Sequence, residues 1–173
     1  MVQKFEFDCF ISHSSKDKFV ARLVRGYLRS HNIDAWIDED HTELSASPKK
    51  AEVLSRLRTA IPQCEWFFLL LSANSLASEF VEAEVAIARK SCDDGVPIKF
   101  VAIDIEDLKG ELPEWARDIT RVKITGDSGL QDPLKTLRDQ VGCFRPTYID
   151  KLHPHFLKQI PINKLNEHLV LCS

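Results

Sequence analysis

The run WFFLLL, residues 66–71, is the feature that most restricts how this chain can fold. Six consecutive apolar residues without alternation are typical of a β-strand that is covered on both faces, and such strands belong mainly to parallel sheets. Neighbouring parallel strands are joined by long crossovers, which are usually helices. The run therefore predicts a parallel sheet with helices on both of its faces.

The rest of the chain supplies the alternation of strands and helices that such a sheet needs. Short apolar runs predict strands, and apolar residues at spacings of three and four predict the helices between them. Because the two types alternate throughout, we expect an α/β fold. The expected strands are 5–11, 33–37, 65–71, 98–104 and 121–125, and the expected helices are 19–30, 49–61, 77–90, one within 112–119, and 132–144.

Composition and charge argue against several classes of protein. The net charge is -3 and no basic cluster is present, so we expect no nucleic-acid partner. No apolar run is long enough to cross a bilayer, and the first residues lack the apolar core of a signal peptide. We therefore expect a cytoplasmic protein without a membrane partner.

The five cysteines are expected to be reduced and idle. They form no CxxC pair and no zinc-ligand spacing, so we expect no metal site. A catalytic cysteine is the weaker alternative, because none lies in an evident activating environment. These residues are Cys9, Cys64, Cys92, Cys143 and Cys172.

Several well-known catalytic and nucleotide-binding motifs are missing. The chain contains neither GxxxxGK[ST] nor GxGxxG, which disfavours a P-loop or a Rossmann phosphate cradle. GxSxG is absent, so a nucleophile elbow is not expected. The strand at 65–71 ends without an aspartate, which disfavours a phosphate-accepting receiver.

Polar loops follow the first three expected strands, and these are the natural place for a site. Open α/β sheets bind ligands beyond the carboxyl ends of their strands. Ser14, with Asp17 three residues later, resembles a capping box. The helix start there offers backbone N–H groups to a phosphate, although a plain cap is the simpler explanation.

Glu84 is the one charged residue that the helical pattern places on an apolar face. At about 100° per residue it projects between Phe80 and Ala88, whereas Glu82 falls on the opposite side. One explanation is that its carboxylate faces a ligand cleft. The other is a rim residue, whose stem covers apolar surface while its head reaches water.

Three segments, taken together, resemble the TIR (Toll/interleukin-1 receptor) domain family. FDCFISHSSKD, residues 7–17, is similar to box 1 of that family. IDAWID, residues 33–38, with the polar loop after it, resembles the second strand and the BB loop. LLLSANSLASEFVEAE, residues 69–84, resembles the strand, serine loop and helix that end in the family pattern [CV]-x-x-E. Over residues 5–144 the chain is identified as a stand-alone member of bacterial type.

The resemblance implies a flavodoxin-like three-layer sandwich, with a five-stranded parallel sheet in the order 2-1-3-4-5. It places a TIR domain at 1–144 and an extension at 145–173 that packs on the domain or mediates contacts. It implies one of two functions. The first is cleavage of NAD at the nicotinamide–ribose bond, giving nicotinamide and an ADP-ribose-type product, in immune or antiphage defence. The second is a non-catalytic interaction module.

For an enzyme of this family, the resemblance makes Glu84 the catalytic carboxylate and NAD the substrate, with no cofactor. It implies substrate contacts from Ser12, His13, Ser14, Phe80 and Asp38, and self-association through TIR–TIR contacts. Phe80 stands where the family usually has tryptophan.

Two of these positions have simpler explanations. A solvated loop histidine explains His13 equally well, and a solvated acidic loop explains Asp38 together with Glu39, Asp40 and Glu43 better than a cation site does. We expect the loop 38–48 to cover the cleft as a lid.

Overall fold

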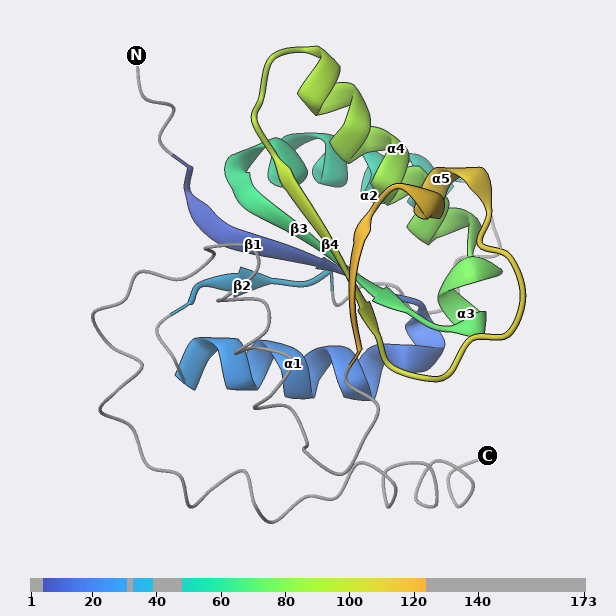
Figure 1. Ribbon diagram of the computed structural model, residues 1–173. Helices are drawn as coiled ribbons and strands as arrows, with labels where there is room; N and C mark the ends of the chain where they lie inside the picture. Colours follow the sequence, from blue (N-terminus) through green and yellow to red (C-terminus); the bar gives the residue numbers. More distant parts are fainter. Residues whose placement is uncertain (1–4, 31–32, 39–47, 124–173) are drawn as a thin grey trace.

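The computed structural model describes residues 5–30, 33–38 and 48–123, which form a five-stranded parallel sheet with helices packed on it (Figure 1). The order of the strands is β2-β1-β3-β4-β5, and every neighbouring pair is parallel. The α/β class and the predicted order 2-1-3-4-5 are therefore confirmed. The strands are β1 (Phe7–Ser12), β2 (Ala35–Trp36), β3 (Cys64–Leu71), β4 (Lys99–Asp104) and β5 (Thr120–Lys123).

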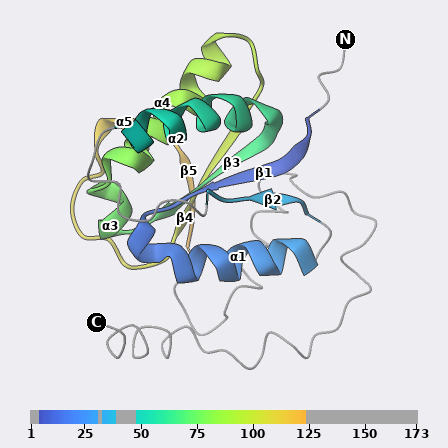
Figure 2. The ribbon, with the colours of Figure 1, turned by 180° about the vertical axis from the view of Figure 1, so that it is seen from behind.

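The helices lie on both faces of the sheet and make a three-layer sandwich. Helix α1 (Lys18–Ser30) covers one face, whereas α2 (Pro48–Ala60) and α4 (Glu79–Asp93) cover the other (Figures 1 and 2). The short helices α3 (Ala73–Leu76) and α5 (Glu114–Arg117) lie between strands. Two 3-10 turns, η1 (Ser15–Asp17) and η2 (Ile61–Gln63), precede α1 and β3.

The helix expected at 77–90 is confirmed as α4, and the short helix α3 precedes it, where the sequence indicated only a polar loop. Ser72 and Ser75 form a capping box that begins α3, and Ser78 caps α4 by accepting from the N–H of Val81. Serine favours such caps because its hydroxyl replaces the missing partners of the first turn. The chain therefore turns between α3 and α4, and the loop expected after the third strand contains one short capped helix.

The other differences from the expected elements are small or fall outside the described residues. Strand β2 pairs through two residues only, at one edge of the sheet. The expected helix 132–144, the boundary at 144, the extension 145–173 and the lid loop 39–47 lie outside the described residues.

Alternate side chains of strand β3 belong to two separate apolar cores, one on each face of the sheet. Trp66, Phe68 and Leu70 pack with residues of α1 on one side. Phe67, Leu69 and Leu71 pack with residues of α2 and α4 on the other. The prediction that 66–71 is a strand covered on both faces is confirmed.

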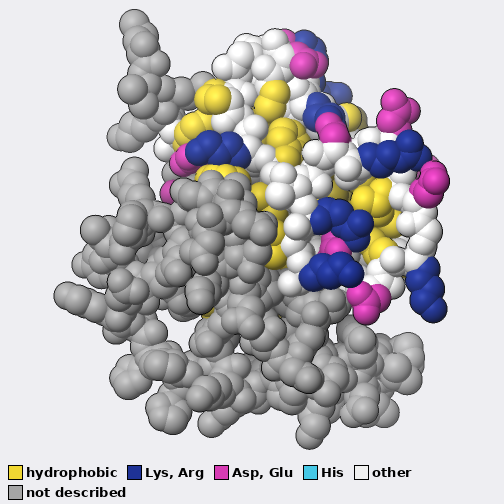
Figure 3. Space-filling model, viewed as in Figure 1, with side chains coloured by type: hydrophobic (Ala, Val, Ile, Leu, Met, Phe, Trp, Pro, Cys, Tyr) yellow, Lys and Arg dark blue, Asp and Glu magenta, His cyan; other side chains and the backbone are white. Residues whose placement is uncertain are grey.

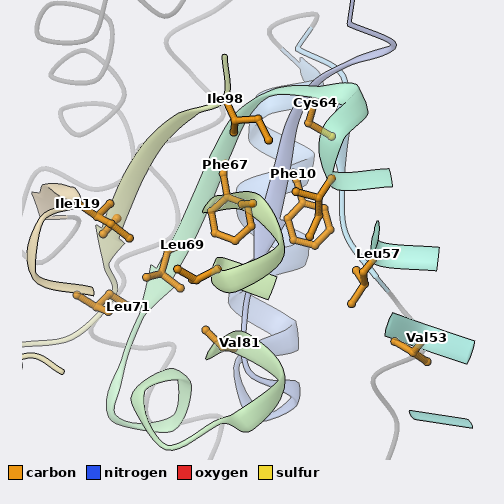
Figure 4. Packing of buried hydrophobic residues seen from close by; sticks show 14 residues of the cluster. Phe10, Val53, Leu57, Cys64, Phe67, Leu69, Leu71, Val81, Ile98 and Ile119 are labelled. Carbon is orange, nitrogen blue, oxygen red and sulfur yellow. The ribbon is translucent and has the colours of Figure 1, made fainter. Parts of the chain in front are cut away.

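Aromatic rings fill the centre of the core under α2 and α4. The ring of Phe67 stacks on Phe10, with centroids 5.4 Å apart, and Phe10 stacks on Trp36 at 5.2 Å. Phe100 contacts the other side of Phe67 at 5.4 Å. Figure 4 shows Phe10 and Phe67 side by side, with Leu57 approaching from α2. This cluster ties β1, β3 and β4 to one another at mid-sheet.

The visible described surface carries charges of both signs in close mixture (Figure 3). Arg89 pairs with Asp118 and Arg117 with Glu111, so positive side chains lie beside negative ones. Within residues 5–30, 33–38 and 48–123, no helix is long and apolar enough to cross a membrane.

Candidate functional site

The carboxyl edge of the sheet gathers most of the buried polar side chains of the described chain. Ser12, the last residue of β1, lies beside Leu69 of β3, and Asp104, the last of β4, lies beside Leu71. The loops after these strands therefore meet at one edge, as expected for a parallel sheet. The buried polar residues at this edge or reaching it are Ser12, His13, Ser14, Asp17, Asp38, Ser72, Ser75, Glu84 and Asp104.

Glu84 reaches this edge from α4 and is bonded to β1. Its side chain has 0% exposure, and the hydroxyl of Ser12, also 0% exposed, donates to its Oε2 at 2.5 Å. Val81, Val85 and Ala88 are buried on the same face of α4, which presses that face onto the sheet. The inward direction predicted from helical phase is confirmed, and the rim explanation is wrong because the carboxylate does not reach water.

The loop after β1 is buried as well. His13 is 1% exposed, and its Nδ1 lies 3.3 Å from the carbonyl oxygen of Ile11. A solvated loop histidine is therefore wrong. Ser14 caps η1 by accepting from the N–H of Lys16 at 3.4 Å, which is the plain capping role.

Asp17 does not behave as the second member of a capping box. Its Oδ2 accepts from the hydroxyl of Ser72 at 2.5 Å, and its Oδ1 accepts from Nδ2 of Asn74 at 2.9 Å. The carboxylate thus joins the loop after β1 to the loop after β3. Sequence reasoning missed this pair, although the expected adjacency of β1 and β3 was a signal that their loops would meet.

The other two predicted substrate contacts are Phe80, which packs in an apolar cluster, and Asp38, which forms an ion pair. Phe80 is partly buried and packs against the apolar cluster under α2 and α4. Asp38 is 3% exposed and accepts from Arg56 of α2 at 3.4 Å. A solvated acidic loop is therefore wrong for Asp38, whose buried charge lies beside the guanidinium of Arg56, a side chain that stays 45% exposed.

A fourth buried carboxylate, Asp104, lies at the end of β4, where sequence reasoning predicted no functional residue. Asp104 accepts two hydrogen bonds from Arg121 of β5, at 3.0 Å from Nε and 2.7 Å from the terminal nitrogen. The hydrogen bond to Asp104 raises the pKa of Arg121. This bidentate pair fixes β5 to β4 and keeps the buried charge compensated.

Cys64 is a poor candidate for a nucleophile or a metal ligand. Cys64 is buried, and burial, followed by the charges of Asp34 and Glu6, raises the pKa of its thiol to about 12. The thiolate is the reactive form, so this residue is inert at neutral pH. No group of three or more His, Cys, Asp and Glu that would hold a metal occurs in residues 5–30, 33–38 and 48–123.

Comparison with known proteins identifies the family. The family model for the TIR domain matches residues 9–138, which is most of the chain. No curated protein sequence matches.

Similar solved structures are TIR domains. One is the structure of the TIR domains in the activated Roq1 resistosome, which directly recognizes the pathogen effector XopQ. This chain matches it at 19% identity with a TM-score of 0.42. That match covers 58% of this chain and 60% of the other. Another is the TIR domain of the Toll-related receptor TRR-2 from Hydra magnipapillata, at 12% identity and a TM-score of 0.48. It covers 79% of this chain and 96% of the other. The family match over residues 9–138, on the fold described above, shows that this chain belongs to the TIR domain family.

Proposed function

We propose that the chain cleaves NAD at the nicotinamide–ribose bond and releases nicotinamide and an ADP-ribose-type product, linear or cyclic. The observation that carries the proposal is the buried Glu84 carboxylate, held by Ser12 at the carboxyl edge of the sheet. Membership of the TIR family, in which some members cleave NAD, supports it further. By the same resemblance, the product serves as a signal in immune or antiphage defence.

The chemistry needs one carboxylate. The nicotinamide ring of NAD is a pyridinium cation, and when the bond to ribose breaks it takes the electron pair and leaves as a neutral base, so no general acid has to protonate it. The ribose then develops oxocarbenium character, as in other glycosyl transfers. Water captures this cation to give linear ADP-ribose, or the adenine ring of the same molecule captures it to give a cyclic product, and a proton is released in either case. Glu84 would stabilise that charge, and a preorganised carboxylate in a site closed to bulk water does so far more strongly than one in solution.

Substrate access requires a change from the described conformation. Glu84 has 0% exposure, so NAD reaches its carboxylate only after the structure over it moves. A ribose hydroxyl can then bond to the other carboxylate oxygen, Oε1, while Ser12 keeps its bond to Oε2. The chain as described is thus a closed form of the proposed enzyme.

The Ser12 hydroxyl is expected to orient Glu84 for catalysis. Charge-assisted hydrogen bonds are the stronger class, so Ser12→Ala should lower kcat by roughly tenfold. Ser30→Ala is the matched control, because Ser30 is exposed and donates to the carbonyl of Tyr27 at the end of α1. Steady-state NAD kinetics measure both variants. Full activity in Ser12→Ala would show that catalysis by Glu84 does not depend on the hydrogen bond from Ser12.

Self-association is the second part of the proposal and rests on the family resemblance. If a neighbouring subunit completes or opens the cleft, specific activity should rise with protein concentration. Activity assays combined with light scattering over a wide concentration range test this. A constant specific activity from a chain that stays monomeric during turnover would remove the idea.

The alternative is a non-catalytic TIR interaction module. Full burial of Glu84 with a bonded partner favours it, because the same arrangement suits a purely structural carboxylate. Incubating the purified chain with NAD and resolving the products by chromatography separates the two functions. Nicotinamide with linear or cyclic ADP-ribose supports the enzyme, and intact NAD in concentrated samples supports the module.

A further inference from the structure

The Asp17 carboxylate uses both of its oxygens on one loop. Its Oδ2 accepts from Ser72 Oγ, and its Oδ1 accepts from Asn74 Nδ2, at 2.5 and 2.9 Å. The orientation of the Ser72 hydroxyl is fixed, because it donates to Asp17 and its oxygen also accepts from the N–H of Ser75 at 2.9 Å. One carboxylate thus fixes the residue that caps α3 and a residue inside α3.

The same two chain segments are joined a second time at Glu84. Ser12 of β1 donates to Glu84 of α4, and Ser72 after β3 donates to Asp17 after β1. In each bond a serine meets a carboxylate, but the two segments exchange roles. Between the cross-links lie the short helix α3 and the first turn of α4, so their position depends on both bonds.

A third contact holds the α3 segment from the opposite side. The N–H of Ala73 donates to the carboxylate of Glu106, which follows β4. The loop after β3 is therefore tied to the loops after both neighbouring strands. Carboxyl-edge loops shape the ligand site in folds of this type.

We propose that Asp17 is a positioning residue of the NAD site. It clamps the loop after β3 onto the loop after β1, so that the two sides of the site keep one spacing for the substrate. This inference rests on the proposed function, and it adds a residue that touches neither Glu84 nor the reacting atoms. Ser12 and the packed face of α4 still hold Glu84 when the clamp is lost. Loss of the clamp should therefore weaken the binding of NAD and leave Glu84 in place.

The test compares Asp17→Asn with an exchange of the two side chains. Asparagine at 17 keeps an acceptor for Ser72 but turns an amide N–H₂ toward the N–H₂ of Asn74. The double variant Asp17→Asn with Asn74→Asp restores that bond with its direction reversed. Asp94→Asn is the control, because it makes the same chemical change in an exposed carboxylate that pairs with Lys90.

We expect Asp17→Asn to raise KM for NAD about tenfold, with kcat within about threefold of the original chain. The exchange variant should recover most of the loss, and Asp94→Asn should match the original chain. An unchanged KM in Asp17→Asn, a fall confined to kcat, or an exchange variant as impaired as the single one would overturn the proposal.

Hydrogen exchange keeps the clamp testable even if the chain never cleaves NAD. The amides of Leu76, Ala77 and Ser78 donate to backbone carbonyls within and just before α3. Asp17→Asn should speed their exchange while core amides of β3 stay protected, and the exchange variant should slow it again. Absence of NAD cleavage with this pattern would reject the enzyme but keep the clamp. Unchanged exchange at these amides would reject the clamp itself.

Discussion

Replacing Glu84 by glutamine is expected to reduce NAD cleavage by at least about 10²-fold, while the chain stays folded. Glutamine keeps the side-chain volume, and its carbonyl oxygen can still accept from Ser12, whose hydroxyl lies 2.5 Å from the carboxylate. What it removes is the negative charge that would stabilise the developing ribosyl cation. Nicotinamide release measures the activity, and circular dichroism with thermal unfolding checks the fold.

The control for this variant lies two residues earlier on the same helix. Glu82 is exposed, whereas Glu84 is buried, so Glu82→Gln makes the same chemical change on the solvent side of α4. It should keep most of the activity. Equal loss in both variants would mean that general electrostatics of α4, and not one placed carboxylate, supports the reaction.

Phe67→Ala is expected to lower the free energy of unfolding by about 3–5 kcal/mol, because it empties a fully enclosed position. Phe67 is 0% exposed; its ring stacks on that of Phe10 and makes a tilted contact with that of Phe100. Its loss removes apolar burial and leaves a cavity that three strands line. Urea denaturation of the purified chain measures the change.

Phe19→Ala is the matched control for the core. Phe19 is the large apolar side chain that α1 leaves 49% exposed, so its removal should change stability by no more than about 0.5 kcal/mol. A similar small change for Phe67 would show that the aromatic stack on β3 is not the centre of the core.

The fold was predictable because its signals are local. The run 66–71 indicates a strand covered on both faces, and the structure divides its side chains between two cores. Helical spacing identified α1, α2 and α4, since each buries one face. Helix α3 was missed, because the segment 72–78 is short and rich in serine, and only the capping box of Ser72 and Ser75 begins a helix there.

The site was predictable only in part, because its contacts are distant in sequence. Helical phase pointed Glu84 inward, but nothing local names its partner Ser12, which is 72 residues away. Asp17 was read as a local cap, whereas its partners come from the loop after β3. Asp38 was expected either as a substrate contact or as part of a solvated acidic loop, because the sequence does not show that Arg56 of α2 lies beside it.

The burial of Glu84 connects the proposed chemistry with its regulation. A carboxylate without exposure keeps the described chain closed to substrate, so any activity depends on an opening step. Self-association is the step that we propose. The dependence of activity on concentration and the loss of activity in Glu84→Gln are therefore separate readouts, one of opening and one of chemistry.

The most direct test of the central claim is the rate of nicotinamide release from NAD. It should be measured for the original chain and for Glu84→Gln side by side, at matched and increasing protein concentrations. We predict release by the original chain that grows more than linearly with concentration, and a rate at least about 10²-fold lower for the variant throughout. Equal rates for the two proteins, or no release by the original chain at any concentration, would contradict the assignment of Glu84 as the catalytic carboxylate.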